Sequence, residues 1–418
     1  MERGRRLDRA FGAAASNLSA RDRGFVHELT YGTTRLRGRI DHLIGRHVDR
    51  GLTSVAPPVL EVLRLGAYQA LYMDAVPAFA AVSESVDQVR AVAGRRPAGM
   101  VNAVLRRVAE DGDGADVFPD PARDPVGFLE SWGSHPRWLL ERWLQRLLYR
   151  EVRALVEHDN RRPPTFLVAL DLGLAEVLAR LGEAGVTADP VAEGPTTVRL
   201  PDDAHPSAAL DAVPGSIIQD PAAGLVARYA DVPVGRNVVD LCAAPGGKAL
   251  ALSGQAGHVL AADLSEPRIR LVGENSRRTG RAISCVVADA LHPPLRRADF
   301  VLLDVPCSGT GTLARHPDAR WRLDPEGIRR FADLQGRMLE SAQQLVPPDG
   351  LIVYSTCTLE PEENEDQVDR FLGTHPEFRI ESTGSVRGDV LDTVGRLSVT
   401  PWSAGFDGAF AARMRRTG

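Results

Sequence analysis

The chain has 418 residues, of which 44% are hydrophobic and 25% are charged, and its formal net charge is −5. This length suggests two or three domains, and the composition excludes a broadly disordered chain and a strongly basic nucleic-acid coat protein. The N-terminus MERGRRLDRAF lacks the apolar core of a signal peptide, and no apolar stretch is long enough to span a bilayer. Four cysteines without paired spacing indicate reduced thiols. We therefore expect a cytoplasmic protein with no disulfide framework, no metal site and no membrane partner.

The first part of the chain, residues 1–112, has helical periodicity. Apolar residues recur every three or four positions in four stretches, 20–48, 57–73, 77–92 and 99–110. Pro57, Pro77 and Pro97 stand where a helix begins or breaks. We predict an all-α domain with arginine-rich exposed faces. The Gly/Pro/Asp-rich stretch 111–125 marks its boundary.

The middle part, residues 124–234, mixes helical and strand-like segments. A tryptophan-bearing helix, HPRWLLERWLQRL, precedes a strand-like TFLVAL, a helix near 175–181, and two further strand-like runs, TTVRL and SIIQD. This pattern predicts a small α+β module that connects the flanking domains, and the family resemblance given below implies that it binds RNA.

The last part, residues 235–418, alternates short β-rich runs with helices. The runs are VVDL, HVLAAD, ISCVVAD, FVLLDV and LIVYST, and two final strands are predicted in RLSVTPW and DGAFAARMRR. Such alternation is typical of a parallel, doubly wound, Rossmann-like α/β sheet. The fold class is therefore α/β, preceded by an all-α domain and a small α+β module.

A Gly/Pro-rich loop joins the first of these strands to a helix, in VVDLCAAPGGKALAL. Such a loop brings backbone N–H groups and a helix N-terminus close to a ligand. Its spacing fits neither GxxxxGK[ST] nor GxGxxG, which disfavours phosphate binding. The loop residues expected against the ligand are Cys242, Ala243, Ala244, Pro245, Gly246, Gly247 and Lys248.

Two acids end the next two strands, Asp263 and Asp289. The first is placed to bind ribose hydroxyls, and the second to accept from an adenine amino group. Each could instead cap the helix that follows it. A ligand with ribose and adenine but no phosphates is S-adenosylmethionine.

Two cysteines follow predicted strands, Cys307 in VLLDVPCSGTG and Cys357 in LIVYSTCTLEPEENE. The carboxyl ends of strands are where a doubly wound sheet binds ligands. Two thiols there, beside Asp304, predict a thiol-nucleophile active site rather than two buried hydrophobes. The residues alone do not decide which cysteine is the nucleophile. A helix predicted to begin at Pro361 would place its dipole near Cys357.

The motifs DLCAAPGGK, DVPCSGTG with RHPDARW, and YSTCT with PEENE resemble those of the Sun-type family of RNA cytosine-5 methyltransferases. RDRGFVHELTYGTTR, VPAFAAV and GMVNAVLRRV resemble the NusB-like domain that precedes the catalytic domain in bacterial members acting on 16S ribosomal RNA. The resemblance covers nearly the whole chain. One departure is Thr358, where the family usually has serine.

The resemblance implies transfer of a methyl group from S-adenosylmethionine to carbon 5 of a cytosine in ribosomal RNA, through a covalent cysteine adduct. It makes Cys357 the nucleophile and places Asp304 and Cys307 in the motif that reads the base, with Asp304 also near the cofactor. Lys248, the only lysine of the chain, is expected at the same edge, beside Asp304. It also implies an RNA-binding role for residues 1–112.

Other readings remain at this stage. The substrate could be 16S ribosomal RNA or transfer RNA, and DNA is not expected. The helical domain could belong to an RNA-binding factor with an inactive enzyme domain, although the intact loop, acids and cysteines argue against it. An adenine amino-methyltransferase would need an Asn/Asp-Pro-Pro-aromatic string where this chain has DVPCSG.

Overall fold

The computed structural model describes residues 6–417. Its contacts divide the chain into two compact units. The helical unit comprises Met1–Arg162 and Leu313–Arg322, and the sheet unit comprises Pro163–Thr312 and Leu323–Gly418. Among the described helices, none is both long enough and apolar enough to cross a membrane.

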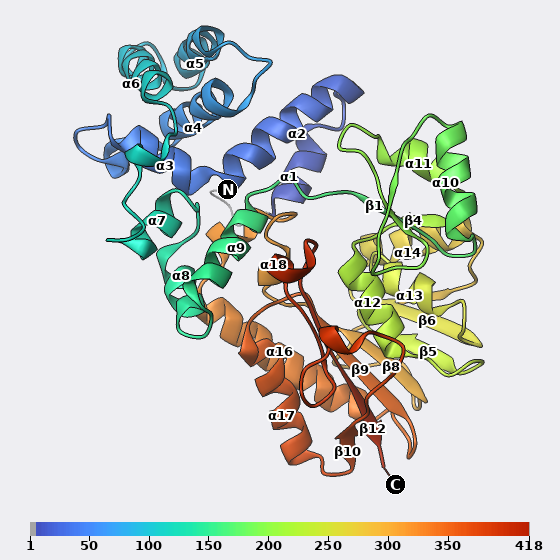
Figure 1. Cartoon of the computed structure of the whole chain (residues 1–418). Coiled ribbons are helices and arrows are strands. Elements are labelled where there is room, and N and C mark those ends of the chain that lie inside the picture. Colours follow the sequence, from blue (N-terminus) through green and yellow to red (C-terminus); the bar gives the residue numbers. More distant parts are fainter. Residues whose placement is uncertain (1–5, 418) are drawn as a thin grey trace. The chain divides into compact units, whose positions relative to one another are not determined.

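The main part of the helical unit contains α-helices and short 3-10 turns, as predicted (Figure 1). Pro57 is the first residue of its helix, and Pro77 and Pro97 directly precede theirs, because a proline ring fits the start of a helix but not its interior. The single helical stretch expected over 20–48 is two helices, because the backbone leaves helical geometry at Leu36. The helices are α1 (Leu7–Ala14), α2 (Ala20–Arg35), α3 (Arg37–Gly45), α4 (Pro57–Tyr72), α5 (Ala78–Ala93), α6 (Ala98–Asp111), α7 (Pro125–Ser131), α8 (Arg137–Leu144) and α9 (Tyr149–Asp159).

A short segment from the second half of the sequence, Leu313–Arg322 with helix α15 (Ala319–Arg322), belongs to the helical unit. Its Arg320 is fully buried and donates to the carbonyls of Ser134 and Asp159 and to the side chain of Asn160, at 2.8–3.1 Å. The neighbouring indole N–H of Trp321 also donates to a backbone carbonyl of the helical unit. Buried charges are tolerated only when their hydrogen bonds are made, so Arg320 fixes this segment in place.

The sheet unit is built on an eight-stranded sheet in the order β10-β12-β9-β8-β5-β6-β7, with β11 paired to β12. Strands β5 to β9 are parallel, and β12 returns antiparallel to β9. The order reverses between β5 and β8, the place where a doubly wound sheet opens a ligand crevice. The strands are β5 (Asn237–Asp240), β6 (His258–Asp263), β7 (Ser284–Val287), β8 (Phe300–Asp304), β9 (Leu351–Thr356), β10 (Phe378–Ile380), β11 (Leu397–Val399) and β12 (Ala409–Arg416).

Helices cover both faces of this sheet, because successive strand side chains point to opposite sides. Val301 and Leu303 pack in a core with α16 (Pro325–Gln343) and α17 (Glu365–Thr374). Phe300 and Leu302 point to the opposite face of the sheet and pack in a second core with three further helices. These are α12 (Pro221–Ala230), α13 (Gly247–Leu252) and α14 (Glu266–Thr279). The predicted Rossmann-like α/β fold is confirmed.

A second, antiparallel sheet of four strands in the order β2-β3-β1-β4 precedes the large sheet in the chain. With two helices it forms the α+β part predicted from the sequence. The four-stranded sheet belongs to the sheet unit, whereas α7, α8 and α9 belong to the helical unit. The boundaries of a separate module over residues 124–234 therefore remain a prediction. The elements are β1 (Phe166–Ala169), α10 (Leu174–Glu183), β2 (Asp189–Pro190), β3 (Thr197–Arg199), α11 (Pro206–Ala212) and β4 (Ser216–Ile218), and α18 (Pro401–Ala404) lies near the C-terminus of the chain.

Arg320→Ala should lower the free energy of unfolding by about 3 kcal/mol, because it leaves several buried carbonyl groups without a donor. Urea unfolding measures this loss. Arg329→Ala, which removes an exposed arginine paired with Glu326, is the matched control and should change stability by less than about 0.5 kcal/mol. Equal effects of the two variants would contradict an anchoring role of Arg320.

Candidate active site

The carboxyl ends of the parallel strands carry a row of acids and a thiol. Asp240 is the last residue of β5, Asp263 of β6 and Asp304 of β8. Asp289 comes two residues after β7, and Cys357 directly follows β9. Because these strands are parallel neighbours, the groups lie along one edge of the sheet.

The two cysteines meet at this edge, with their sulfur atoms 3.3 Å apart. They do so because β8 and β9 are paired, which aligns the loops that follow. The hydrogen bond with Cys357 and burial both raise the pKa of the Cys307 thiol. Cys307 is therefore held as a thiol, and the two sulfur atoms lie within hydrogen-bonding distance, with either able to donate.

A buried carboxylate, Glu363, ties the two cysteine loops together. It accepts from the backbone N–H of Ser308 at 2.9 Å and from its hydroxyl, and from the hydroxyl of Thr358 at 3.3 Å. These two residues directly follow the two cysteines. Gln335 donates to the same carboxylate at 2.9 Å. Burial raises the pKa of Glu363, while its hydrogen bonds oppose that shift.

The loop after Cys307 also approaches the loop after β9 at Gly311. Its N–H donates to the carbonyl of Cys357 at 3.0 Å. A Cβ at this position would stand 2.8 Å from that oxygen and 3.0 Å from the Cα of Gly408. Only glycine permits this approach.

The lone lysine and the acid of the β8 motif form an ion pair. The Nζ atom of Lys248 lies 2.7 Å from Oδ2 of Asp304, while the hydroxyl of Ser355 donates to Oδ1 at 2.7 Å. Burial lowers the pKa of Lys248, but the carboxylate of Asp304 raises it more, so the amine stays protonated. The pair therefore presents one proton donor and one acceptor side by side.

A cavity of about 390 Å³ lies against the Gly/Pro-rich loop. Ala243, Ala244, Pro245, Gly247 and Lys248 line it, together with Asp304 and Asp240. The loop turns through a left-handed Gly246 before α13 begins. The side chains of Lys248, Asp304 and Asp240 make part of its lining polar, so the cavity suits a ligand with polar groups.

Asp263 and Asp289 lie outside the residues that line this cavity. Asp263 is buried and accepts from the backbone N–H groups of Ala244 and Ser265, at 3.3 and 2.9 Å. Helix α14 has Ser265, not Asp263, as its N-cap. Asp289 accepts from the N–H of Leu291, and no helix follows it before β8. Neither acid is a helix N-cap.

One feature differs from the expected site. Residues Pro361–Glu363 form a single 3-10 turn, and α17 begins at Glu365. A helix dipole at Pro361 was therefore a wrong prediction. Burial and the charge of Asp240 raise the pKa of Cys242, so this loop thiol stays protonated.

Several site residues were not predicted from the sequence. Ser355, Ser308 and Glu363 are ordinary polar residues in their local patterns, and only the pairing of β8 with β9 brings them together. Glu363 lies in PEENE, one of the motifs that carry the resemblance, but the sequence did not show that this residue connects the two cysteine loops. Within residues 6–417, no cluster of three His, Cys, Asp or Glu side chains is arranged to hold a metal ion.

Family models match three successive parts of the chain. The NusB family matches residues 1–110, a ferredoxin-like domain of RsmF/B-like methyltransferases matches residues 135–205, and 16S rRNA methyltransferase RsmB/F matches residues 232–415. The large sheet and its Gly/Pro-rich loop therefore lie in the part of the chain that matches a methyltransferase, and the helices before them lie in the part that matches the NusB family.

Relatives that align with most of this chain support the same family. The probable ribosomal RNA small subunit methyltransferase B of Synechocystis sp. is 34% identical, over 96% of this chain and 92% of that protein. The ribosomal RNA small subunit methyltransferase B of Klebsiella pneumoniae is 32% identical, over 92% and 89%. The crystal structure of PH0851 is similar with a TM-score of 0.79 and 26% identity, covering 97% of this chain and 93% of that one.

The chain belongs to the 16S rRNA methyltransferase RsmB/F family. It is therefore a ribosomal RNA methyltransferase whose substrate is RNA, and its cofactor is S-adenosylmethionine. The resemblance drawn from the motifs is confirmed.

Lys248→Arg should slow methyl transfer on the order of a hundredfold, because a planar guanidinium in place of a compact ammonium misplaces Asp304. Cofactor affinity should fall much less, because the sequence predicts that the loop contacts the cofactor mainly through its backbone. Single-turnover kinetics measures the rate. A rate within a factor of about three of wild type would mean that the lysine is incidental.

Proposed function

We propose that this protein methylates carbon 5 of a cytosine in 16S ribosomal RNA through a covalent bond between Cys357 and the base. The observation that carries the proposal is the pair of thiols 3.3 Å apart at the edge that also holds the Lys248–Asp304 ion pair. Relatives named as small subunit methyltransferases support the choice of 16S ribosomal RNA, and no observation favours transfer RNA. Thiol chemistry of this kind suits the reducing cytoplasm.

The reaction needs a nucleophile because carbon 5 of cytosine does not attack an electrophile unaided. The thiolate of Cys357 adds to carbon 6, and the electrons of the C5–C6 double bond move toward carbon 5 and N3. S-adenosylmethionine supplies the electrophilic methyl group. The hydrogen bond from Cys307 stabilises the thiolate before it attacks.

The Lys248–Asp304 pair manages the proton of the base. A carboxylate that already accepts from Lys248 and Ser355 remains an acceptor, and it suits the exocyclic amine of cytosine. The ammonium of Lys248 is the group that can deliver a proton to N3 as carbon 6 is attacked.

The second thiol acts at the release step. The bond from carbon 5 to its hydrogen breaks, and this proton passes to solvent. Its electrons restore the C5–C6 double bond as the bond from carbon 6 to sulfur breaks, so Cys357 leaves as a thiolate, and N3 returns its proton to the amine of Lys248. Cys307, held as a thiol, donates to the leaving sulfur and so stabilises the departing charge. The target base must be unstacked to reach both sulfur atoms.

Cys357→Ala should lower the methylation rate by at least roughly a thousandfold while leaving cofactor affinity intact. Cys307→Ala should permit attack but slow release, so a protein–RNA adduct should accumulate and survive denaturing electrophoresis. Cys285→Ala, an exposed thiol on β7, is the control. An adduct with Cys357→Ala and none with Cys307→Ala would reverse the two roles.

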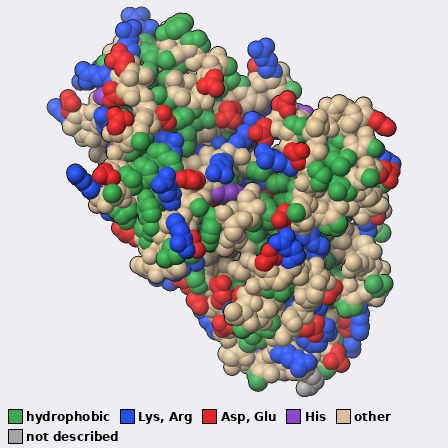
Figure 2. Space-filling view, viewed as in Figure 1, with side chains coloured by type: hydrophobic (Ala, Val, Ile, Leu, Met, Phe, Trp, Pro, Cys, Tyr) green, Lys and Arg blue, Asp and Glu red, His purple; other side chains and the backbone are tan. Residues whose placement is uncertain are grey.

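We further propose that the NusB-like helices bind the RNA. Residues 1–110 contain 17 arginines and 11 acidic residues, an excess of six positive charges in a chain of net charge −5. Figure 2 shows arginines interspersed with acids over the visible face, without one continuous basic patch. A local RNA-binding site on these helices is therefore a better candidate than an extended basic surface.

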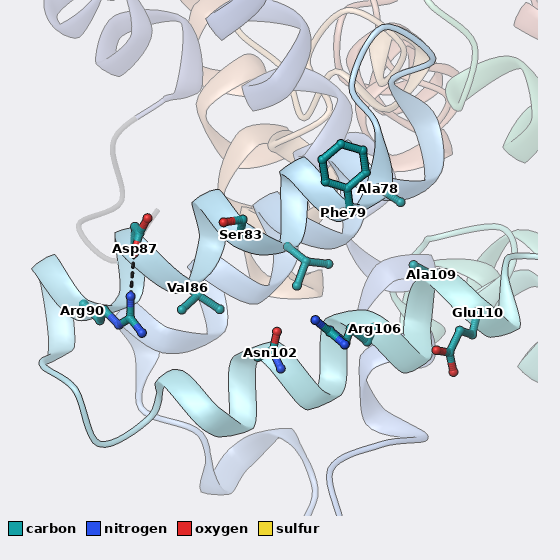
Figure 3. Close-up of a pocket in the computed structure, with 11 residues that line it drawn as sticks. Ala78, Phe79, Ser83, Val86, Asp87, Arg90, Asn102, Arg106, Ala109 and Glu110 are labelled. Carbon is teal, nitrogen blue, oxygen red and sulfur yellow. Dashed lines mark hydrogen bonds and ion pairs between the residues drawn. The ribbon is translucent and has the colours of Figure 1, made fainter.

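A cavity of about 650 Å³ between α5 and α6 is that candidate (Figure 3). The Phe79 ring is 79% exposed at its rim, and Asn102 and Arg106 reach from α6 toward α5. Arg106 is exposed and makes no ion pair among the described residues, whereas Arg90 is paired with Asp87. An exposed ring beside an amide and a guanidinium suits an unstacked nucleotide.

Phe79→Ala should weaken RNA binding by about 1–3 kcal/mol, the value of stacking one base. Arg106→Ala should also weaken binding and reduce its salt dependence, since a phosphate contact releases a counterion. Fluorescence anisotropy with ribosomal RNA fragments at several salt concentrations measures both. Val92→Ala, at another exposed apolar position of α5, should leave affinity unchanged. Unchanged affinity in all three variants would place RNA binding elsewhere.

A further inference from the structure

The two cysteines of the reactive edge are close enough to form a disulfide bond with each other. Their sulfur atoms lie 3.3 Å apart, and a disulfide bond joins sulfur atoms at about 2.0 Å, so an approach of about 1.3 Å closes the gap. Cys307 and Cys357 are 50 positions apart in the chain, and folding has already brought them together. The loop-closure entropy of such a bond is therefore lost before the bond forms.

The two loops that carry these cysteines are fixed through groups other than the sulfur atoms. Glu363 accepts from Ser308 and Thr358, which directly follow the two cysteines. The N–H of Gly311 donates to the carbonyl of Cys357 at 3.0 Å. A cysteine side chain turns about its Cα–Cβ bond, so the sulfur atoms can approach while these hydrogen bonds stay in place. The network holds the pair ready for a bond and need not break when the bond forms.

The surroundings of the pair favour reaction with a small oxidant. Both cysteines are half-buried rather than sealed in the core, so a molecule of the size of hydrogen peroxide reaches them. Burial lowers the pKa of Lys248, whereas Asp304, and after it a thiolate at Cys357, raise that pKa, so the ammonium lies within electrostatic reach of Cys357. A nearby cation favours the thiolate form of a cysteine, which is the form that peroxides oxidise. The hydrogen bond with Cys357 and burial raise the pKa of Cys307, which stays a thiol.

We propose that Cys307 and Cys357 form a modification site for hydrogen peroxide, at which oxidation to a disulfide bond reversibly stops methyl transfer. The thiolate of Cys357 attacks one peroxide oxygen, the O–O bond breaks, and the hydroxide that leaves takes up a proton from solvent to become water. Cys357 is then a sulfenic acid. The sulfur of Cys307 attacks that of Cys357, the S–S bond forms, the S–O bond breaks, and the leaving hydroxide takes the proton of Cys307 as a second water. The pair of thiols loses two electrons, and the peroxide gains them.

The disulfide bond removes both groups that the proposed chemistry uses. Cys357 has no thiolate to add to carbon 6, and Cys307 has no proton to donate. This loss of activity rests on the proposed function, whereas formation of the bond depends only on the sulfur pair. The bond also protects the site, because a sulfenic acid that meets no thiol is oxidised further to a sulfinic acid, which dithiols do not reduce. Disulfides of this kind in reducing compartments are transient and regulatory.

Treatment of the reduced 418-residue protein with a small molar excess of hydrogen peroxide tests the proposal. The number of free thiols should fall from four to two. Mass spectrometry of unreduced peptides should find Cys307 joined to Cys357, with Cys285 still a thiol, although Cys285 is the exposed cysteine. The methylation rate should fall at least roughly tenfold and return after treatment with dithiothreitol.

Two variants separate this site from general oxidation of thiols. Cys307→Ser leaves Cys357 without a thiol to capture its sulfenic acid, so peroxide should convert Cys357 to a sulfinic acid that dithiothreitol does not reduce. Cys285→Ser, the matched control at a thiol outside the pair, should form the bond as wild type does and lose two of its three thiols.

Two outcomes contradict the proposal in different ways. Oxidation of Cys285 before the pair, or four free thiols after treatment, would overturn the disulfide site and leave the proposed function untouched. A complete disulfide between Cys307 and Cys357 with an unchanged methylation rate would show that Cys357 is not the nucleophile. That result would overturn both the proposed function and the reversible control of activity.

Discussion

The geometry of the reactive edge depends on one buried carboxylate. Glu363 holds the residues that follow both cysteines, so neither loop can move without breaking hydrogen bonds between buried side chains. Apolar packing fixes side chains less strictly in direction than hydrogen bonds do. A sulfur–sulfur distance of 3.3 Å, close enough for one thiol to donate to the other, is therefore set by a polar network rather than by the hydrophobic core beneath it.

The charge along the edge explains why this sheet suits a sulfonium cofactor rather than a phosphate ligand. Asp240, Asp263, Asp289 and Asp304 end or follow neighbouring strands; Lys248 is paired with Asp304, and Arg268 is paired with Asp263. An edge with four acids disfavours a phosphate and suits S-adenosylmethionine, which is cationic at its sulfur. The thiols lie at the other end of the row, where the pKa of Cys307 is raised and its proton is retained.

The sequence allowed prediction of the strands, the loop and the two cysteine motifs, because these depend on local periodicity and on residues adjacent in the chain. It did not predict which strands are neighbours, and that order alone brings Cys307 to Cys357 and Ser355 to Asp304. The prediction of a helix beginning at Pro361 was wrong, because proline is compatible with the first turn of a helix but does not extend the helix beyond a single 3-10 turn.

The motif RHPDARW follows the Cys307 loop in the chain but belongs to the helical unit. The chain leaves the sheet unit at Thr312, five residues after Cys307, and returns at Leu323. Between these points Arg320 is buried, and its acceptors belong to residues before Arg162. The segment that follows the Cys307 loop in the chain is therefore held by hydrogen bonds within the helical unit, whereas the loop itself, through Ser308 and Gly311, is held within the sheet unit.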